Sequence, residues 1–254
     1  MPQTLRVTFP GHDKLMLDGR LELPDQAPSC HAVFAHCFTC SKDLLSTFRI
    51  SKQLAARGIA TLRFDFAGLG TSEGDFADTS FSTQIQDLLA ACDFLSQQHQ
   101  PPSLLIGHSL GGTAALAAAG QYESVRAVAT IAAPGQPQHV LHHFGEALAA
   151  LQAGRDASIE VAGVRYTVRP QFVQDVQGHD MQKTLATLHK PVLIFHVDGD
   201  TIVGPHNAEQ IQQWCAGETR LYPLRGTDHV LSDRQSASVV SNAIADFAEQ
   251  QGLC

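Results

Sequence analysis

A serine in residues 107–111, Gly-His-Ser-Leu-Gly, has the surroundings of an enzymatic nucleophile. The five residues fit the pattern G-x-S-x-G, in which a sharp turn between a strand and a helix exposes the serine hydroxyl. Residues 104–106 are apolar, and residues 114–119 are rich in alanine, as that turn requires. Glycine at both ends lets the strand and helix backbones approach closely. The pentapeptide also occurs by chance, but with these flanks it predicts that Ser109 is a nucleophile.

A serine nucleophile needs a base that takes its proton and a third group that orients the base. In open α/β sheets such groups lie at the carboxyl ends of strands. His229 follows the last predicted strand, and Asp198 and Asp200 both follow the strand before it. The order serine, aspartate, histidine along the chain is that of an α/β-hydrolase. We favour Asp200 as the acid, because Asp198 precedes a glycine and is equally well explained as a turn residue.

Backbone N–H groups must bind the negative charge that forms on the substrate oxygen during attack. The first predicted donor is Leu110, the residue after the serine. The second is Phe38, in the loop after the first buried strand. The alternative is that Phe38 only packs against the site.

Two cysteines flank Phe38 and form a C-x-x-C pattern, Cys37 to Cys40. A redox role would require a low thiol pKa and exposure, and a zinc site would require a second pair of ligands. We favour two small reduced side chains that line the loop. The alternative hypothesis is that oxidation of the pair distorts the Phe38 donor and switches activity off.

Two other patterns are weak candidates for ligand sites. Gly68, Gly70 and Gly74 miss the spacing of a nucleotide-binding loop by one position, and the next residues are acidic. His139 and the pair at 142–143 have no carboxylates nearby that would complete a metal site. We therefore expect no metal and no nucleotide cofactor.

The predicted elements alternate between strands and helices along most of the chain. Residues 4–9 and 15–23 alternate apolar and polar side chains, which predicts two antiparallel strands. Further strands are predicted at residues 31–36, 59–66, 104–106, 125–132, 191–197 and 219–224. Helices are predicted at residues 43–57, 81–97, 114–119, 207–215 and 233–250. This α/β alternation predicts a mostly parallel, twisted sheet with helices on both faces.

Residues 135–190 interrupt that alternation. A helix is predicted at residues 139–153, a hairpin at 158–168 and short helices at 172–188. Because an antiparallel hairpin does not belong in a parallel α/β sheet, we interpret residues 135–190 as a cap inserted into a single domain, residues 1–254.

Three apolar side chains are candidates for an acyl pocket beneath this cap. They are Phe144, Phe172 and Val203. Ordinary core packing explains them equally well, because pockets and cores use the same residue types.

Composition excludes several classes of protein. The chain is 44% hydrophobic and 17% charged, which is enough for a sizeable core. Its formal net charge of −8 argues against nucleic acid and anionic membranes as partners. The first residues lack the layout of a signal peptide, and no apolar run is long enough for a bilayer. The six cysteines are too few for a disulfide scaffold, so we expect a reduced, cytoplasmic protein.

Four segments together resemble the α/β-hydrolase superfamily: residues 36–42, 64–74, 107–112 and 226–229. More closely, the chain resembles the hydrolase half of bacterial proteins that fuse such a hydrolase to an OsmC-type peroxidase-like domain. It is more distantly similar to feruloyl and cinnamoyl esterases, whose inserted cap shapes the acyl pocket. The superfamily usually has His-Gly where this sequence has His36-Cys37, a difference that the fusion hydrolases share. The sequence ends without an OsmC-type domain, so a link to such a partner stays open.

The predicted triad, together with the resemblance, favours a serine carboxylesterase that acts through an acyl-enzyme. Small to medium acyl or aryl esters are expected as substrates, because the chain has no long apolar lid segment. The resemblance also favours Asp200, which occupies the D-x-x-V position. No cofactor is implied. Thioesterase, amidase and cofactor-free perhydrolase activity on the same triad are alternatives, as is a binding module that kept the fold without catalysis. The oligomeric state is not determined, and a homodimer is open.

Overall fold

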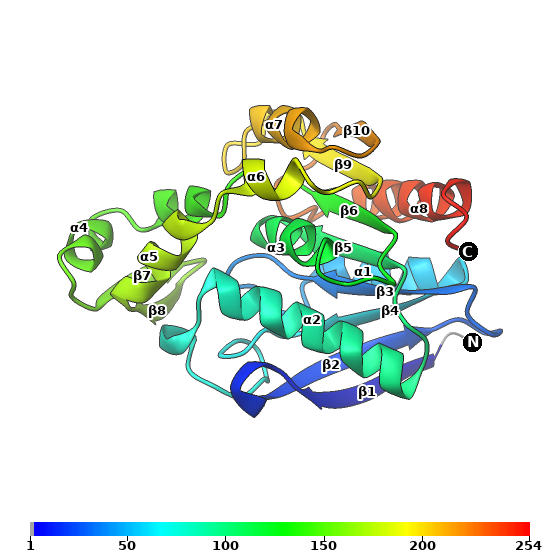
Figure 1. The fold of residues 1–254 in the computed structure, drawn as a ribbon, viewed down its shortest axis with the longest axis horizontal. Coiled ribbons are helices and arrows are strands. Elements are labelled where there is room, and N and C mark those ends of the chain that lie inside the picture. Colours follow the sequence, from blue (N-terminus) through cyan, green and yellow to red (C-terminus); the bar gives the residue numbers. More distant parts are fainter. Residues whose placement is uncertain (1–2) are drawn as a thin grey trace.

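The computed structural model describes residues 3–254, and its centre is an eight-stranded sheet (Figure 1). The strand order is β1-β2-β4-β3-β5-β6-β9-β10. The bounds are β1 (Gln3–Pro10), β2 (Met16–Leu23), β3 (Cys30–Ala35), β4 (Ile59–Phe64), β5 (Leu104–His108), β6 (Ala127–Ile131), β9 (Val192–Val197) and β10 (Thr219–Leu224). The strands from β4 to β10 in that order are parallel, whereas β1 and β2 pair antiparallel. The predicted mostly parallel sheet is confirmed.

Helices cover both faces of this sheet, because its central strands are apolar on both faces. Strands β3 to β6 are buried along their whole length. One face packs against α1 (Leu45–Ala56) and α8 (Arg234–Gln250). The other packs against α2 (Phe81–Gln98), α3 (Leu110–Ala119) and α7 (His206–Trp214). The two faces therefore hold separate apolar cores, as an α/β fold requires.

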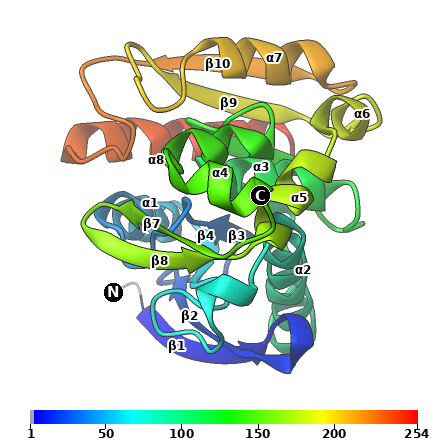
Figure 2. The ribbon, with the colours of Figure 1, turned by 90° about the vertical axis from the view of Figure 1, so that its left-hand side faces the viewer.

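The inserted segment, residues 135–190, lies between β6 and β9 and projects from one end of the molecule (Figures 1 and 2). Its elements are η3 (Pro137–His143), α4 (Ala147–Gln152), β7 (Ala157–Val161), β8 (Val164–Val168), α5 (Pro170–Gly178) and α6 (Met181–Leu185). The predicted hairpin is present, with positive φ at Ala162 and Gly163 as a tight two-residue turn requires. The single helix predicted at residues 139–153 is wrong. It is divided in two near Gly145, which has a φ of +49°.

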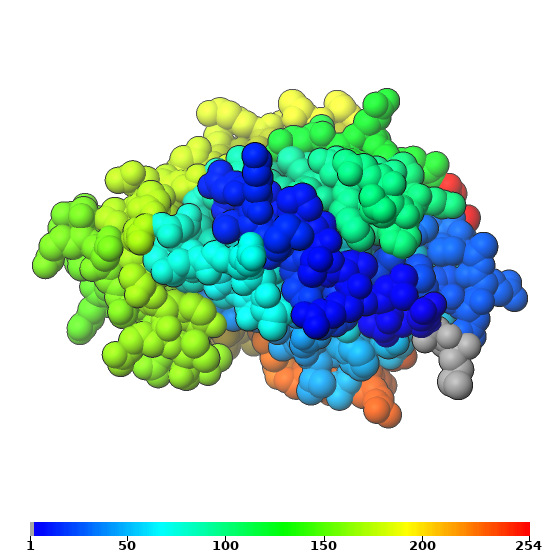
Figure 3. All heavy atoms as spheres, turned by 90° about the horizontal axis from the view of Figure 1, so that it is seen from below, coloured from blue at the N-terminus to red at the C-terminus, as the bar shows by residue number. Residues whose placement is uncertain are grey.

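The inserted segment is packed onto the rest of the protein at two places. Its hairpin lies against η2 (Phe76–Asp78), and Figure 3 shows the segment in yellow-green beside that cyan region. Its helix α5 contacts the start of α2, where the Asp175 carboxylate accepts bonds from the Ser82 N–H (2.9 Å) and hydroxyl (2.6 Å). A carboxylate at a helix N-terminus is favourable because it meets unpaired N–H groups. These contacts fix the segment over one edge of the sheet.

The structure contains two disulfides, Cys30–Cys254 and Cys37–Cys40. The prediction of a fully reduced chain is therefore wrong. Their Cα–Cα distances, 5.1 and 5.2 Å, lie in the range of protein disulfides. Cys30 and Cys254 are 224 positions apart, so only the folded chain brings them together. Among residues 3–254, no helix is both long and apolar enough to cross a bilayer.

Helix α3 approaches the end of β3 so closely that only glycine fits between them. A Cβ on Gly111 would lie 2.2 Å from the carbonyl oxygen of His36 and 2.5 Å from that of Ala35. Backbone atoms cannot move aside as a flexible side chain can. The second glycine of the pattern around the serine is thus a packing requirement between two elements.

Gly111→Ala should therefore lower the free energy of unfolding by about 1–3 kcal/mol, the usual effect of overpacking. The measurement is urea unfolding followed by circular dichroism. Gly120→Ala is the matched control, because Gly120 follows the same helix and a Cβ there meets nothing within 4 Å. That control should be neutral or stabilising by up to about 1 kcal/mol. Equal midpoints for the two variants would contradict the packing argument.

Candidate active site

Ser109 occupies the sharp turn between β5 and α3 that the sequence predicts. Its φ of 52° and ψ of −127° lie outside the helical and strand regions, an uncommon conformation for a residue other than glycine. The Ser109 N–H donates to the Ile131 carbonyl at 2.8 Å, and the Gly112 N–H donates to the Ser109 carbonyl at 2.8 Å. Neighbouring structure thus imposes the strained turn, as is common at functional sites.

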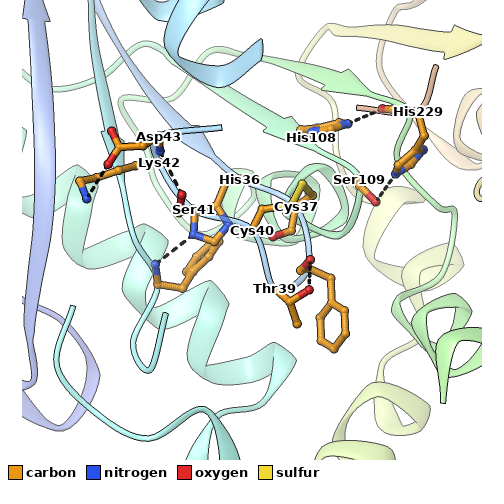
Figure 4. Close-up of a disulfide and its surroundings, with 12 residues drawn as sticks. His36, Cys37, Thr39, Cys40, Ser41, Lys42, Asp43, His108, Ser109 and His229 are labelled. Carbon is orange, nitrogen blue, oxygen red and sulfur yellow. Dashed lines mark hydrogen bonds and ion pairs between the residues drawn. A yellow bond between two sulfur atoms is a disulfide. The ribbon is translucent and has the colours of Figure 1, made fainter. Parts of the chain in front are cut away.

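The three predicted members of the triad meet at this turn. His229 Nε2 lies 3.0 Å from Ser109 Oγ, and His229 Nδ1 lies 2.7 Å from Asp200 Oδ2. Because a carboxylate only accepts, Nδ1 carries the proton and Nε2 is free to accept the serine hydroxyl. Figure 4 shows the side chains of Ser109 and His229 pointing toward each other. The arrangement can activate a serine hydroxyl.

Asp200 is held as an ionised carboxylate. Its side chain is fully buried, and Oδ1 accepts from the N–H groups of Ile202 (2.8 Å) and Val203 (3.0 Å). Burial acts to raise the pKa of Asp200, but the His229 bond and the two N–H donors outweigh it and lower the pKa. Asp200 is therefore charged at neutral pH and can hold the His229 imidazole in one orientation.

The neighbouring candidate, Asp198, points elsewhere. Its side chain is half-exposed, and its Oδ2 lies 3.2 Å from Arg225 Nε at the surface. The loop after β9 therefore presents Asp200, rather than Asp198, to His229.

His108, the residue before Ser109, contacts the backbone of His229, and the sequence did not predict this role. Its Nε2 lies 2.7 Å from the carbonyl oxygen of His229, so it donates a hydrogen bond to the backbone of that residue. The ring is buried, and burial first, then the nearby His229, lowers the pKa of His108 to about 3. Because His108 stays neutral near physiological pH, its Nε2–H can remain the donor to the His229 carbonyl. The only signal in the sequence was a histidine at a variable position of G-x-S-x-G.

The loop between β3 and α1 (residues 36–44) contains Phe38 and is fastened at both ends. At its start, His36 Nδ1 donates to the Cys37 carbonyl at 2.8 Å, and Nε2 accepts from the Phe66 N–H at 3.3 Å. At its far end, Lys42 donates to Asp65 through both its N–H and its ammonium, each at 2.7 Å. Lys42 and Asp65 are both buried. Asp65 follows β4, so the loop is tied to the neighbouring strand.

Within residues 3–254, the backbone N–H groups of Phe38 and Leu110 donate to no acceptor of the protein. Leu110 begins α3, and the first N–H groups of a helix have no partner within it. Gly111 packs against the His36 carbonyl, so the β3–α1 loop begins directly beside this helix. Two unpaired donors thus belong to adjoining elements near Ser109.

The pocket candidates fall in two places. Phe144 stacks with Phe38 at a centroid distance of 6.2 Å, and the Phe172 ring contacts Phe38 at a tilt with a centroid distance of 5.7 Å, in a buried aromatic cluster. This cluster also contains Phe76 and Tyr166. Val203 lies outside these ring contacts, on the loop that holds Asp200. The inserted segment therefore covers the β3–α1 loop with aromatic side chains.

The histidines of η3 surround an open cavity of about 600 Å³ beside the Asp200 loop. His139, His142 and His143 contribute to it, together with His206. Among residues 3–254, no group of three or more His, Cys, Asp or Glu side chains is arranged to hold a metal ion. His139 Nε2 instead lies 2.8 Å from the Ile202 carbonyl and contacts the acid loop.

The chain is similar to known proteins in sequence and in fold. A family model described as serine aminopeptidase, S33, matches residues 33–175, more than half of the chain. The esterase domain of a Rhodothermus marinus protein is 39% identical, with 98% of each chain covered and a TM-score of 0.80. Est1E from Butyrivibrio proteoclasticus, solved with ferulic acid bound, is 20% identical over 96% of this chain and 99% of its own, with a TM-score of 0.77, and supports the fold alone.

Curated relatives are more distant. The human palmitoyl-protein thioesterase ABHD10, named as mitochondrial, is 23% identical over 206 residues, or 76% of this chain. The chain spans 64% of the length of that relative. The mouse ABHD10 is 28% identical over 206 residues, 76% of this chain and 66% of its own length.

Asp200→Asn should lower kcat by about 10³–10⁴-fold, because an amide no longer fixes the imidazole tautomer. Asp198→Asn is the matched control on the same loop and should leave kcat within about threefold. The measurement is steady-state hydrolysis of a chromogenic ester. A large loss in Asp198→Asn without one in Asp200→Asn would reverse the assignment.

His108→Phe should lower kcat by about 10–100-fold with little change in KM, because the His229 carbonyl loses its buried donor. His108→Gln keeps an N–H donor of similar reach and should retain most of the rate. The comparison of kcat and KM in the two variants tests this positioning role. If the Phe variant matched the wild type, the bond to the His229 carbonyl would have no part in the reaction.

Proposed function

Because the chain belongs to the serine aminopeptidase S33 family of α/β-hydrolases, we propose that it is a serine carboxylesterase acting through an acyl-enzyme. The observation behind the proposal is the continuous hydrogen-bond chain from Ser109 through His229 to Asp200, with distances of 3.0 and 2.7 Å. The 39% identity to an esterase domain supports the same reaction class. A binding module without catalysis would not need these three side chains to be joined by hydrogen bonds.

In the proposed reaction, Ser109 Oγ attacks the ester carbonyl carbon while His229 Nε2 takes the hydroxyl proton. Asp200 stabilises the imidazolium that forms. The unpaired N–H groups of Leu110 and Phe38 bind the negative oxygen of the tetrahedral intermediate. His229 then returns the proton to the departing alcohol, which leaves an acyl group on Ser109. Water, deprotonated by the same histidine, releases the acid and regenerates the serine.

The acyl group in this proposal is small to medium or aromatic. Phe144 and Phe172 contact Phe38 in a buried cluster, so the protein beside the Phe38 N–H is lined by aromatic rings. Aromatic walls suit apolar groups and leave specificity to the few polar groups at the reacting carbonyl. In the proposal Val203 does not line the acyl pocket, and its N–H instead donates to the Asp200 carboxylate.

A thioesterase is the second candidate, because the curated relatives are named palmitoyl-protein thioesterases. The same triad would attack a thioester, with a thiol leaving in place of an alcohol. The identities of 23–28% and the partial coverage of those relatives make this the weaker proposal. Nothing in the geometry favours amide or perhydrolase chemistry over these two.

The location and the partners stay proposals. The expected partner is a small ester, and the net charge of −8 argues against nucleic acid and anionic membranes. The cytoplasm remains the location predicted from the sequence, whereas the human relative is named as mitochondrial. A homodimer stays open.

A panel of aryl esters of graded acyl length, with matched thioesters, tests the reaction and its acyl preference. Wild-type kcat/KM should be highest for short to medium or aromatic acyl groups and should favour esters. Ser109→Ala should lower kcat by about 10⁵–10⁶-fold, as removal of the nucleophile does in other serine hydrolases. Equal rates for the wild type and Ser109→Ala would refute the serine mechanism.

A further inference from the structure

The Cys37–Cys40 disulfide closes a tight turn around Phe38. The Cys40 N–H donates to the Cys37 carbonyl at 3.1 Å, and the two Cα atoms are 5.2 Å apart. These are the features of a four-residue β-turn, with Phe38 and Thr39 at its two central positions. Figure 4 shows the disulfide within this loop, in the same close-up as the Ser109–His229 pair. The crosslink therefore encloses the residue whose N–H we assign to the oxyanion.

The turn requires a backbone conformation that its sequence disfavours. Thr39, the third residue of the turn, has a φ of +56°. Glycine or asparagine usually occupies that position, and a β-branched residue there is an outlier. Such a conformation persists only where the surrounding structure enforces it.

The disulfide and a hydrogen bond both act on the centre of this turn. The hydrogen bond runs 3.2 Å from the Tyr166 hydroxyl on β8 to the Thr39 carbonyl. The His36 bond reaches Cys37 at the first position of the turn, the Lys42 bonds lie beyond the turn, and neither involves sulfur. Loss of the disulfide would leave the loop attached at both ends, and its strained centre would keep the Tyr166 bond and the packing of the Phe38 ring but no covalent link across it.

We propose that the Cys37–Cys40 disulfide positions the Phe38 N–H for catalysis, so that the disulfide form is the fully active one and the dithiol form has a lower kcat. The inference rests on the proposed esterase function and on Phe38 as an oxyanion donor. In the disulfide form the Ser109–His229–Asp200 contacts are intact and both N–H donors are unpaired. This reverses the hypothesis from the sequence that oxidation of the pair switches activity off.

Reduction by a small dithiol such as dithiothreitol converts the disulfide form of the protein to the dithiol form. A thiolate of the reductant attacks the sulfur of Cys40, the partly exposed member of the pair, and the bond to Cys37 breaks. The Cys37 thiolate takes a proton. The second thiol of the reductant then closes its own ring disulfide and releases Cys40 as a thiol. Two electrons and two protons pass from the reductant to the protein.

The second disulfide, Cys30–Cys254, provides an internal control. It joins residues 224 positions apart, whereas Cys37 and Cys40 are three apart. A crosslink that closes a long loop restricts the unfolded chain more than one that closes a short loop. Loss of Cys30–Cys254 should therefore lower the unfolding midpoint and leave the kcat of the folded enzyme unchanged. Loss of Cys37–Cys40 should instead lower kcat and leave the unfolding midpoint nearly unchanged.

The test compares the wild type, Cys37→Ser/Cys40→Ser and Cys30→Ser/Cys254→Ser, each with and without dithiothreitol. Mass spectrometry of alkylated protein reports the thiols, and circular dichroism reports folding. On reduction, kcat of the wild type should fall by at least about tenfold, with KM nearly unchanged. The upper limit is the loss of about 10²–10³-fold that follows removal of an oxyanion donor. Cys37→Ser/Cys40→Ser should show that low kcat in both conditions. The other variant should respond to reductant as the wild type does.

An alkyl boronic acid separates positioning of the donor from a general structural role, since it forms a tetrahedral adduct with the serine. Its inhibition constant should rise by the same factor as kcat falls, because the adduct uses the same donors as the transition state. Affinity for the carboxylate product should change little.

Some outcomes overturn the proposal and leave the esterase function standing. They are a kcat within twofold of wild type in folded Cys37→Ser/Cys40→Ser, an equal loss on reduction in that variant, and an active wild type without the Cys37–Cys40 bond. If the variant does not fold, reduction of the folded wild type decides the question. Activity that survives Ser109→Ala would instead overturn the proposed function itself.

Discussion

The close approach of two backbones determines the rest of the site. Helix α3 begins against the carbonyl of His36, and only glycine at position 111 leaves room for that contact. Ser109, two residues before Gly111, lies in a strained turn with its hydroxyl toward His229. The contact with His36 sets the start of the β3–α1 loop beside the helix N-terminus. This close packing thus brings Ser109, the proposed nucleophile, and the two unpaired N–H groups into adjoining elements.

Two groups with shifted pKa values then hold His229 in place. Asp200 stays ionised because three donors compensate for its burial, and His108 stays neutral because burial and the nearby His229 lower its pKa. The first orients the His229 ring, and the second holds its backbone. The ion pair of Lys42 with Asp65 fastens the neighbouring loop. Positions are therefore set before a substrate arrives, which is the condition for electrostatic stabilisation of a transition state.

The inserted segment and the disulfides adapt this general scaffold. Tyr166 from the hairpin reaches the Thr39 carbonyl, and the rings of Phe144 and Phe172 pack against Phe38. The segment therefore contacts the same short loop that the Cys37–Cys40 disulfide closes. In the proposed mechanism, that loop links acyl recognition, the oxyanion donor and the redox state of two cysteines.

The sequence by itself determined the mostly parallel sheet, the hairpin and the turn around Ser109, because these depend on local periodicity and on glycines at fixed spacing. It also narrowed the acid to two residues, since strand ends can be predicted from the pattern. Only the tertiary structure decided between Asp200 and Asp198, revealed His108 and Tyr166 as supporting contacts, and paired Cys30 with Cys254. Those contacts join residues far apart in the chain, and their distances follow from packing, which no local pattern encodes.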